Sequence, residues 1–384
     1  MGKWAFLLLA AVLLPAAPAQ TRMSVDQVEQ FLASSAKQPE DRLAAQLAGF
    51  ELTQRVTAER LARWQSHCKG QRSCATLMAL ADAAAFLDLP PEDLPGDPPP
   101  DQATEAAILS RAKDYVRAMR PRLPNFSALR TTTQFETATP QEMLEQERSV
   151  QFQQMSNAKL DYRLLGDAGQ AGVELYQAGI TESRITYRDG GEVTSPEPKT
   201  HKHLRLAPRG LASAGEFGPI LSMVDHDAAR GHIAWHHWER SASGAGEPLT
   251  LLAVYRYSVP SKESHFAIFS DNGSFPGLPP EEDHPGYHGE IAVHPADGSI
   301  FRISIVADPD AADPGALSAL MVEYGSVTIG SKLYMCPVHG AAISTIHVGE
   351  AAGSSRASTP LRKFVNDVTF TQFHLFRSES RILP

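Results

Sequence analysis

Apolar side chains occupy every second position, with polar side chains between them, through several segments of the C-terminal two-thirds of this chain. The clearest case is a pair of segments, Gly289–His294 and Ser299–Val306, which a short turn containing Asp-Gly joins. Successive side chains of a strand point to opposite faces of a sheet, so this pattern predicts a hairpin with one dry and one wet face. A second pair, Met321–Ile329 and Lys332–Val338, meets at a Gly-Ser turn. Short strands joined by tight turns predict an antiparallel meander.

The N-terminal part of the chain follows a different, helical spacing. Residues 20–88 carry apolar stripes of helical period, and Ser24 opens the first of them with a capping box. Residues 89–100 contain six prolines, which lack the amide donor and therefore predict a linker. Residues 101–126 predict a long helix that packs on the sheet and stops at Pro121.

These two patterns together predict an α+β fold, in which a helical N-terminal region precedes an antiparallel β domain over residues 127–384. The 384 residues are 42% hydrophobic and 21% charged, which is typical of a folded globular chain. Asp and Glu number 44 against 35 Lys and Arg, a net charge of -9. This balance argues against nucleic acid as a partner, because phosphate attraction needs clustered cations.

Residues 1–19 have the features of a secretory signal peptide. Lys3 supplies a positive charge, Ala5–Leu14 is an uncharged run, and Ala17 and Ala19 are small residues suited to cleavage after Ala19. The run is shorter than the roughly 20 residues that span a bilayer, and no later apolar run is long enough. We therefore expect no transmembrane segment after signal cleavage and a periplasmic or secreted location.

Export also affects how the three cysteines are interpreted. Cys68 and Cys74 lie six positions apart in a polar turn, and in an oxidising compartment they can form a disulfide or stay free. Cys336 lies in an apolar run and is expected to be a small buried side chain.

The histidines offer one candidate metal pair. His201 and His203 share a strand face about 6.6 Å apart, which suits zinc when a third ligand arrives from another strand. On the strand predicted near residue 236, His236 and His237 are expected to face opposite sides, which argues against a metal site there. A metal-dependent hydrolase using His201 and His203 is the least favoured interpretation. Its third ligand would be Asp283, His284 or His288.

Sequence motifs of catalysis are missing from the chain. It has no Gly-x-Ser-x-Gly elbow, no phosphate-binding loop of the Walker type and no dinucleotide fingerprint. We therefore assign no catalytic residue and no cofactor, and expect a protein that is not an enzyme.

Several short segments resemble a family of uncharacterised exported bacterial proteins. They are Leu80–Leu87, the proline linker, Leu123–Phe126, Gly215–Gly218, Gly286–Ile291 and Val322–Gly325. This resemblance covers nearly the whole mature chain and implies no particular activity.

The order of hairpins resembles a second group, the LolA-like lipoprotein-carrier superfamily. The hairpin Gly289–Val306 followed by Val322–Ile329 and Leu333–Val338 is similar to the late strands of that fold. The resemblance implies a curved antiparallel sheet, a half-barrel, that wraps around helices and encloses an apolar cavity for acyl chains.

Two functions follow from this fold. The first is an exported binding protein with an apolar site beneath the sheet for a hydrophobic ligand such as a lipid or acyl chain. Its expected lining residues are Tyr257, Ile291, Phe301, Ile303 and Phe373. The alternative is a non-enzymatic structural or interaction protein of the cell envelope, in which the helices seal the sheet and the partner is an envelope protein.

Overall fold

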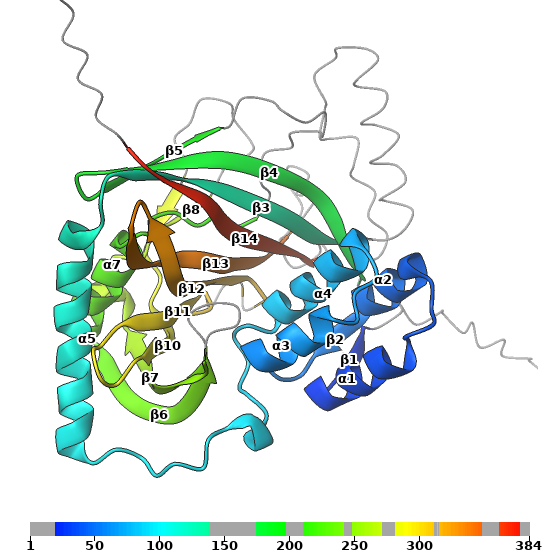
Figure 1. Ribbon diagram of the computed structural model, residues 1–384, viewed down its shortest axis with the longest axis horizontal. Coiled ribbons are helices and arrows are strands. Elements are labelled where there is room, and N and C mark those ends of the chain that lie inside the picture. Colours follow the sequence, from blue (N-terminus) through cyan, green and yellow to red (C-terminus); the bar gives the residue numbers. More distant parts are fainter. Residues whose placement is uncertain are drawn as a thin grey trace, which may run out of the picture.

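A computed structural model describes residues 20–138, 174–196, 210–241, 248–270, 281–310, 313, 315–347 and 361–376. The signal peptide predicted over residues 1–19 and the pair His201 and His203 lie outside these residues. The fold is α+β, as predicted, with a ten-stranded antiparallel sheet and, in the described ranges, six α-helices (Figure 1).

Four helices form the N-terminal region, in blue in Figure 1. They are α1 (Val25–Ser34), α2 (Glu40–Ala48), α3 (Ala58–Gln65) and α4 (Gln71–Ala83). Ser24 caps α1 through the predicted capping box, in which its side chain accepts from Gln27 N. A two-stranded parallel sheet of β1 (Thr21–Met23) and β2 (Phe50–Leu52) joins them. Trp64, which is fully buried, lies in the core that these elements share.

The proline-rich linker contains one 3-10 turn, η1 (Pro91–Asp93), and leads into α5 (Gln102–Arg122). Pro121 was expected to end this helix, yet α5 continues to Arg122 because a proline in the last turn does not interrupt the preceding hydrogen bonds. A helix that the alternation pattern missed, α7 (Pro219–Ala228), follows Gly218. The φ of Gly218, 139°, lies in a region that favours glycine.

The large sheet has the strand order β5-β4-β3-β14-β13-β12-β11-β10-β7-β6, and its edge strands β5 and β6 do not pair, so it is not closed. Every pairing is antiparallel. Its strands are β3 (Phe126–Ala138), β4 (Glu174–Arg188), β5 (Gly191–Pro196), β6 (His232–Ser241), β7 (Thr250–Val259), β10 (Tyr287–Val293), β11 (Ile300–Ala307), β12 (Leu317–Ile329), β13 (Lys332–His347) and β14 (Leu361–Leu375). A separate small hairpin pairs β8 (Ile268–Ser270) with β9 (Glu281–Asp283), after the turn η3 (Ser261–Glu263).

Both predicted hairpins are confirmed, as β10–β11 and β12–β13. The prediction of a simple meander, however, was wrong. The last strand, β14, lies between β13 and the first long strand, β3, and α7 interrupts the run of strands between β5 and β6. Alternation within a strand reports which side is dry but carries no information on which strand is its neighbour.

Helices cover both faces of this sheet. On one face α5 presents Ile108, Ala112, Val116 and Met119, spaced as a helical stripe, to the largest core cluster. On the other face the small side chain of Ala79 on α4 packs against Phe135 and its neighbours. The two helical layers lie on different sides of the sheet, with α5 at the left and α1–α4 at the right in Figure 1.

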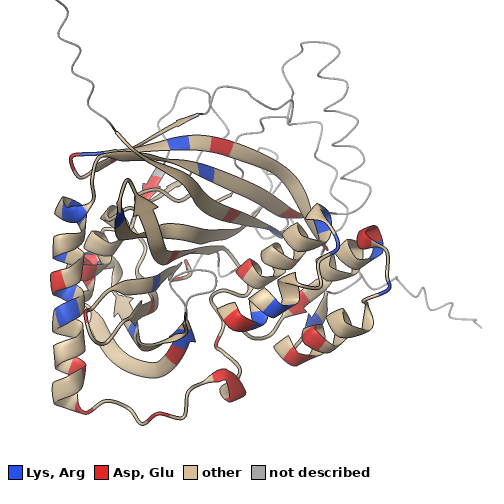
Figure 2. Cartoon of the chain, in the orientation of Figure 1, with Lys and Arg blue, Asp and Glu red and all other residues tan. Residues whose placement is uncertain are grey.

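Charged residues of both signs are interspersed along α5 and the N-terminal helices, whereas the strands carry fewer of them (Figure 2). Some of the charges on the strands contact segments that connect the N-terminal helices, through the polar contacts described below.

Candidate functional site

An apolar pocket lies between α5, α7 and the sheet. Its volume is about 70 Å³. From α5, α7 and the residue after α7 it is lined by Leu109, Ala112, Lys113, Val116, Leu221, Val224, Asp225, Ala228 and Ala229, and from β6, β7 and β10 by Ile233, Tyr257, Ile291 and Val293. Only Lys113 and Asp225 bring charge to this lining.

The size of the pocket limits what it can hold. Ligand pockets usually measure about 300–1,000 Å³, and a cavity of about 150 Å³ accepts benzene. A pocket of about 70 Å³ therefore admits a small apolar group or the end of a chain, not a whole acyl chain. A larger ligand requires α5 and α7 to separate.

The structure places the five predicted lining residues in different positions. Tyr257 and Ile291 line the pocket. Ile303 is 1% exposed inside the same core, where Phe373 packs at its margin. Phe301 does not join them, because it packs with Leu252, Val254 and Ala292 in a separate cluster on the opposite face.

A β-bulge explains why Phe301 is misplaced. The pairing of β10 with β11 shifts between Ala292 and Val293, so that Val293 lies opposite Ile300 and Ala292 opposite Arg302. The extra residue turns Phe301 away from the face that Ile303 occupies. The predicted set of five therefore includes one residue that cannot contact a ligand in this pocket.

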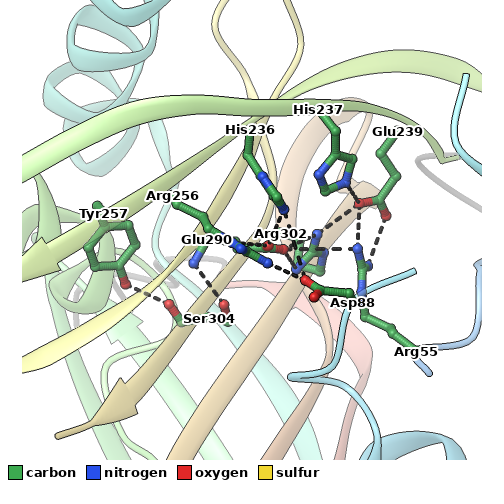
Figure 3. Close-up of polar contacts among 10 residues, drawn as sticks. All are labelled: Arg55, Asp88, His236, His237, Glu239, Arg256, Tyr257, Glu290, Arg302 and Ser304. Carbon is green, nitrogen blue, oxygen red and sulfur yellow. Dashed lines mark hydrogen bonds and ion pairs between the residues drawn. The ribbon is translucent and has the colours of Figure 1, made fainter. Parts of the chain in front are cut away.

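The opposite face of the sheet carries a layer of charged side chains, which Arg55, between β2 and α3, and Asp88, after α4, reach from the N-terminal region (Figure 3). Glu239 of β6 accepts hydrogen bonds from both terminal nitrogens of Arg55, at 3.0 and 2.8 Å, and from Arg302 of β11 at 2.8 Å. Glu290 of β10 contacts Arg302 at 3.2 Å and Arg256 at 3.2 Å. These contacts join the segment after β2 to four neighbouring strands of the sheet, β6, β7, β10 and β11.

The outer part of this charge layer is more exposed. Arg256 donates to Asp88, which follows α4, and His236 lies 3.7 Å from Glu290. Burial lowers the pKa of His236, and the charge of Arg256 lowers it further, so the ring is neutral at neutral pH.

The carboxylates of the charge layer are held in the ionised form. Burial opposes the ionisation of Glu239, but Arg302 and Arg55 outweigh it and keep its pKa well below the usual value. The same two arginines lower the pKa of Glu290 against the effect of burial. This side of the sheet is therefore a region of matched ion pairs that fastens the N-terminal region.

His236 and His237 were predicted to face opposite sides, and this was wrong. The pairing of β6 with β7 shifts between Trp235 and His237, and the bulge brings both rings to the charge layer with their centroids 4.5 Å apart. Their ligand atoms and that of Glu290 lie within 4.8 Å of one another. The neighbouring arginines Arg256 and Arg302 disfavour a cation at this position.

The three cysteines are free thiols in the structure. Cys336 is fully buried in the main core, as expected. Burial raises the pKa of Cys68 to about 12, and a hydrogen bond with the Cys74 thiol adds to this rise. The two side chains are thus neighbours, and their disulfide stays a prediction.

Comparisons with protein-family models, curated proteins and solved structures find no match to this chain. Of the helices in the described ranges, none is both long enough and apolar enough to cross a bilayer. We therefore infer the function from the geometry of the described residues.

Proposed function

We propose that this chain is an exported binding protein whose pocket between α5, α7 and the sheet receives the apolar part of a ligand such as a lipid or fatty acid. The observation that carries the proposal is the nearly uniform apolar lining of that pocket, to which Tyr257 and Ile291 contribute. Export rests on the signal peptide predicted over residues 1–19. A half-barrel of the LolA-like type is the finer description of the fold that this proposal adopts.

The lining favours an amphiphile over a purely apolar ligand. Lys113 is exposed on α5 and Asp225 is half-buried on α7, and both border the pocket. An apolar end within the pocket and a polar headgroup at this border would satisfy both environments. The Lys113 ammonium group would favour an anionic headgroup such as a carboxylate.

Titration with a fluorescent fatty-acid probe tests the proposal. We expect saturable binding to the wild-type protein and at least tenfold weaker binding to Ala228→Phe, because the ring would fill the pocket from α7. Ala106→Phe is the matched control, since Ala106 is exposed on α5 and does not line the pocket. Circular dichroism verifies that both variants fold.

A series of probes of increasing chain length measures how much of the ligand is buried. Each buried CH₂ contributes about 0.8 kcal/mol, or roughly a fourfold gain in affinity. We expect this gain over the first few carbons, as the pocket of about 70 Å³ fills. No saturable binding at any length, or equal binding by Ala228→Phe, would reject the proposal.

The alternative, a structural or interaction protein of the envelope, is supported by one specific observation. Helices cover both faces of the sheet, and the pocket beneath α5 and α7 is small. A protein of this kind would bind no fatty-acid probe. A pull-down with it from envelope extract would recover a stoichiometric partner.

A further inference from the structure

Three carboxylates surround a single histidine at the place where α4 lies against the sheet. His339 of β13 is the centre, with Asp82 of α4, Asp367 of β14 and Glu323 of β12 around it. Asp82 is 3% exposed and Asp367 is 9% exposed. The helix α4 and three consecutive strands far along the chain, β12, β13 and β14, therefore place ionisable groups at one point.

The two ring nitrogens of His339 have different environments. Nδ1 lies 2.9 Å from Glu323 Oε2 and hydrogen bonds to it. Nε2 lies 3.3 Å from one oxygen of Asp82 and 3.3 Å from one oxygen of Asp367, without the geometry of a hydrogen bond to either. Burial disfavours the charged ring, but the carboxylates of Asp82, Asp367 and Glu323 outweigh it and raise the pKa of His339 well above its usual value. A metal ion bound at Nε2, which faces the two aspartates, would therefore displace a proton.

Several polar atoms of this group have no hydrogen-bond partner although they are buried. They include Oδ2 of Asp82, Oδ1 of Asp367 and Nε2 of His339. Buried carboxylate oxygens without partners are costly. Oδ1 of Asp367, one of these unpartnered atoms, lies 3.3 Å from His339 Nε2, where a cation shared with Asp82 would satisfy both atoms. One ligand atom from each of these three residues lies within 4.8 Å of the others.

The charge balance distinguishes this group from the charge layer of Figure 3. There, three arginines match the carboxylates of Glu239, Glu290 and Asp88. Here, within the described part of the chain, neither Asp82 nor Asp367 forms an ion pair with a lysine or arginine. Even with a protonated imidazole the three carboxylates would retain excess negative charge, which burial opposes.

We propose that Asp82, His339 and Asp367 form a binding site for a divalent transition-metal ion, with zinc as the ion to test. Imidazole nitrogen and carboxylate oxygen are ligands that zinc accepts. Glu323 is a positioning residue, since a carboxylate on the second ring nitrogen fixes the tautomer and orientation of a ligating histidine.

The bound ion would fasten α4 to the sheet. Beside it, Ala79 of α4 belongs to a cluster with Phe135 and Val365, and Ala85, which follows α4, belongs to one with Met321 and Ala341. The small side chains of Ala79 and Ala85 favour the close approach of this segment that brings Asp82 to His339. The site lies on the opposite face from the apolar pocket and does not depend on the proposed function.

Calorimetric titration of the chelator-treated full chain with zinc chloride tests the proposal. We expect one equivalent of zinc to bind and the melting temperature to rise with zinc concentration. Asp367→Asn and His339→Ala should weaken binding by at least about a hundredfold, and Glu323→Gln by about 10- to 100-fold, the effect usual for a positioning carboxylate. Glu323 is half-exposed, so its variant is the least disturbing to the fold.

His265→Ala is the matched control. His265 belongs to another group of potential ligands, with His226 and Asp227, and its side chain is 60% exposed. This variant should bind zinc as the wild type does. The absorption spectrum of bound cobalt gives an independent readout of nitrogen and oxygen ligands, and it should change in Glu323→Gln. Absence of zinc binding by the wild type, or loss in His265→Ala with none in His339→Ala, would overturn the assignment.

Discussion

Replacing Glu239 by glutamine should destabilise the protein far more than breaking an ion pair at its surface. Glu239 is 7% exposed and accepts hydrogen bonds from two arginines, Arg55 and Arg302, which are 7% and 5% exposed. The substitution keeps the size of the side chain but removes its charge. Two buried guanidinium groups would then lose their shared counter-ion.

The magnitude can be worked out from these contacts. Two unit charges 4 Å apart attract by about 4 kcal/mol at an effective dielectric constant of about 20. Removing one partner of a buried pair costs about 3–5 kcal/mol. Glu290 remains 3.2 Å from Arg302 and 4.0 Å from Arg55, so it retains part of the compensation. We therefore expect the lower end, a loss of about 3 kcal/mol in the free energy of unfolding.

Urea unfolding at neutral pH measures this loss, with Glu59→Gln as the matched control. Glu59 pairs with Arg63 at 3.0 Å on the surface of α3, and its side chain is 63% exposed. Breaking such a pair costs about 0.5 kcal/mol or less. A loss in Glu239→Gln no larger than that of the control would refute the reasoning.

Acid should narrow the difference in the free energy of unfolding between the wild type and Glu239→Gln. The pKa of Glu239 is lowered in the folded protein, so its stabilising contribution is complete above the usual glutamate pKa. That contribution is lost as the pH falls through the lowered pKa. A difference in the free energy of unfolding that grows in acid would contradict a lowered pKa of Glu239.

The remaining predictions concern a second carboxylate and the cysteines. Burial, helped by the charge of Glu216, raises the pKa of Glu192 to about 7. The stability that protonated Glu192 contributes to the fold is therefore complete below the usual glutamate pKa and is lost as the pH rises toward about 7. Glu192→Gln should therefore be more stable than wild type at pH 8 by on the order of 1–2 kcal/mol in urea unfolding, whereas the exposed Glu182→Gln should show no such gain. Thiol titration of the unfolded, exported protein should find one reactive cysteine if Cys68 and Cys74 pair, and three would contradict that disulfide.

The sequence predicted the elements better than their arrangement. Alternation and turn residues located the hairpins β10–β11 and β12–β13, because both signals are local. The insertion of β14 between β3 and β13 is a pairing of the first and last long strands. No local pattern specifies such a neighbour, since each strand needs only a dry face and a partner of suitable register.

The polar sites were missed for a different reason. Asp82 lies within an alanine-rich helix and is 3% exposed, so an isolated acid in an apolar helix was the available signal. Its partners come from three strands more than two hundred residues later. Spacing rules for metal ligands apply to neighbours in sequence and could not connect them.

β-bulges decide which side chains meet on each face of this sheet. Extending the β12–β13 hairpin from its turn in strict register would place Val338 opposite Glu323. The pairing instead shifts between Glu323 and Tyr324, so that Glu323 lies opposite His339 and both side chains share a face. The same kind of shift turned Phe301 away from the pocket and His237 toward Glu290. A bulge inserts one residue and reverses every side chain beyond it, which is why alternation located the strands but misassigned the residues nearest these sites.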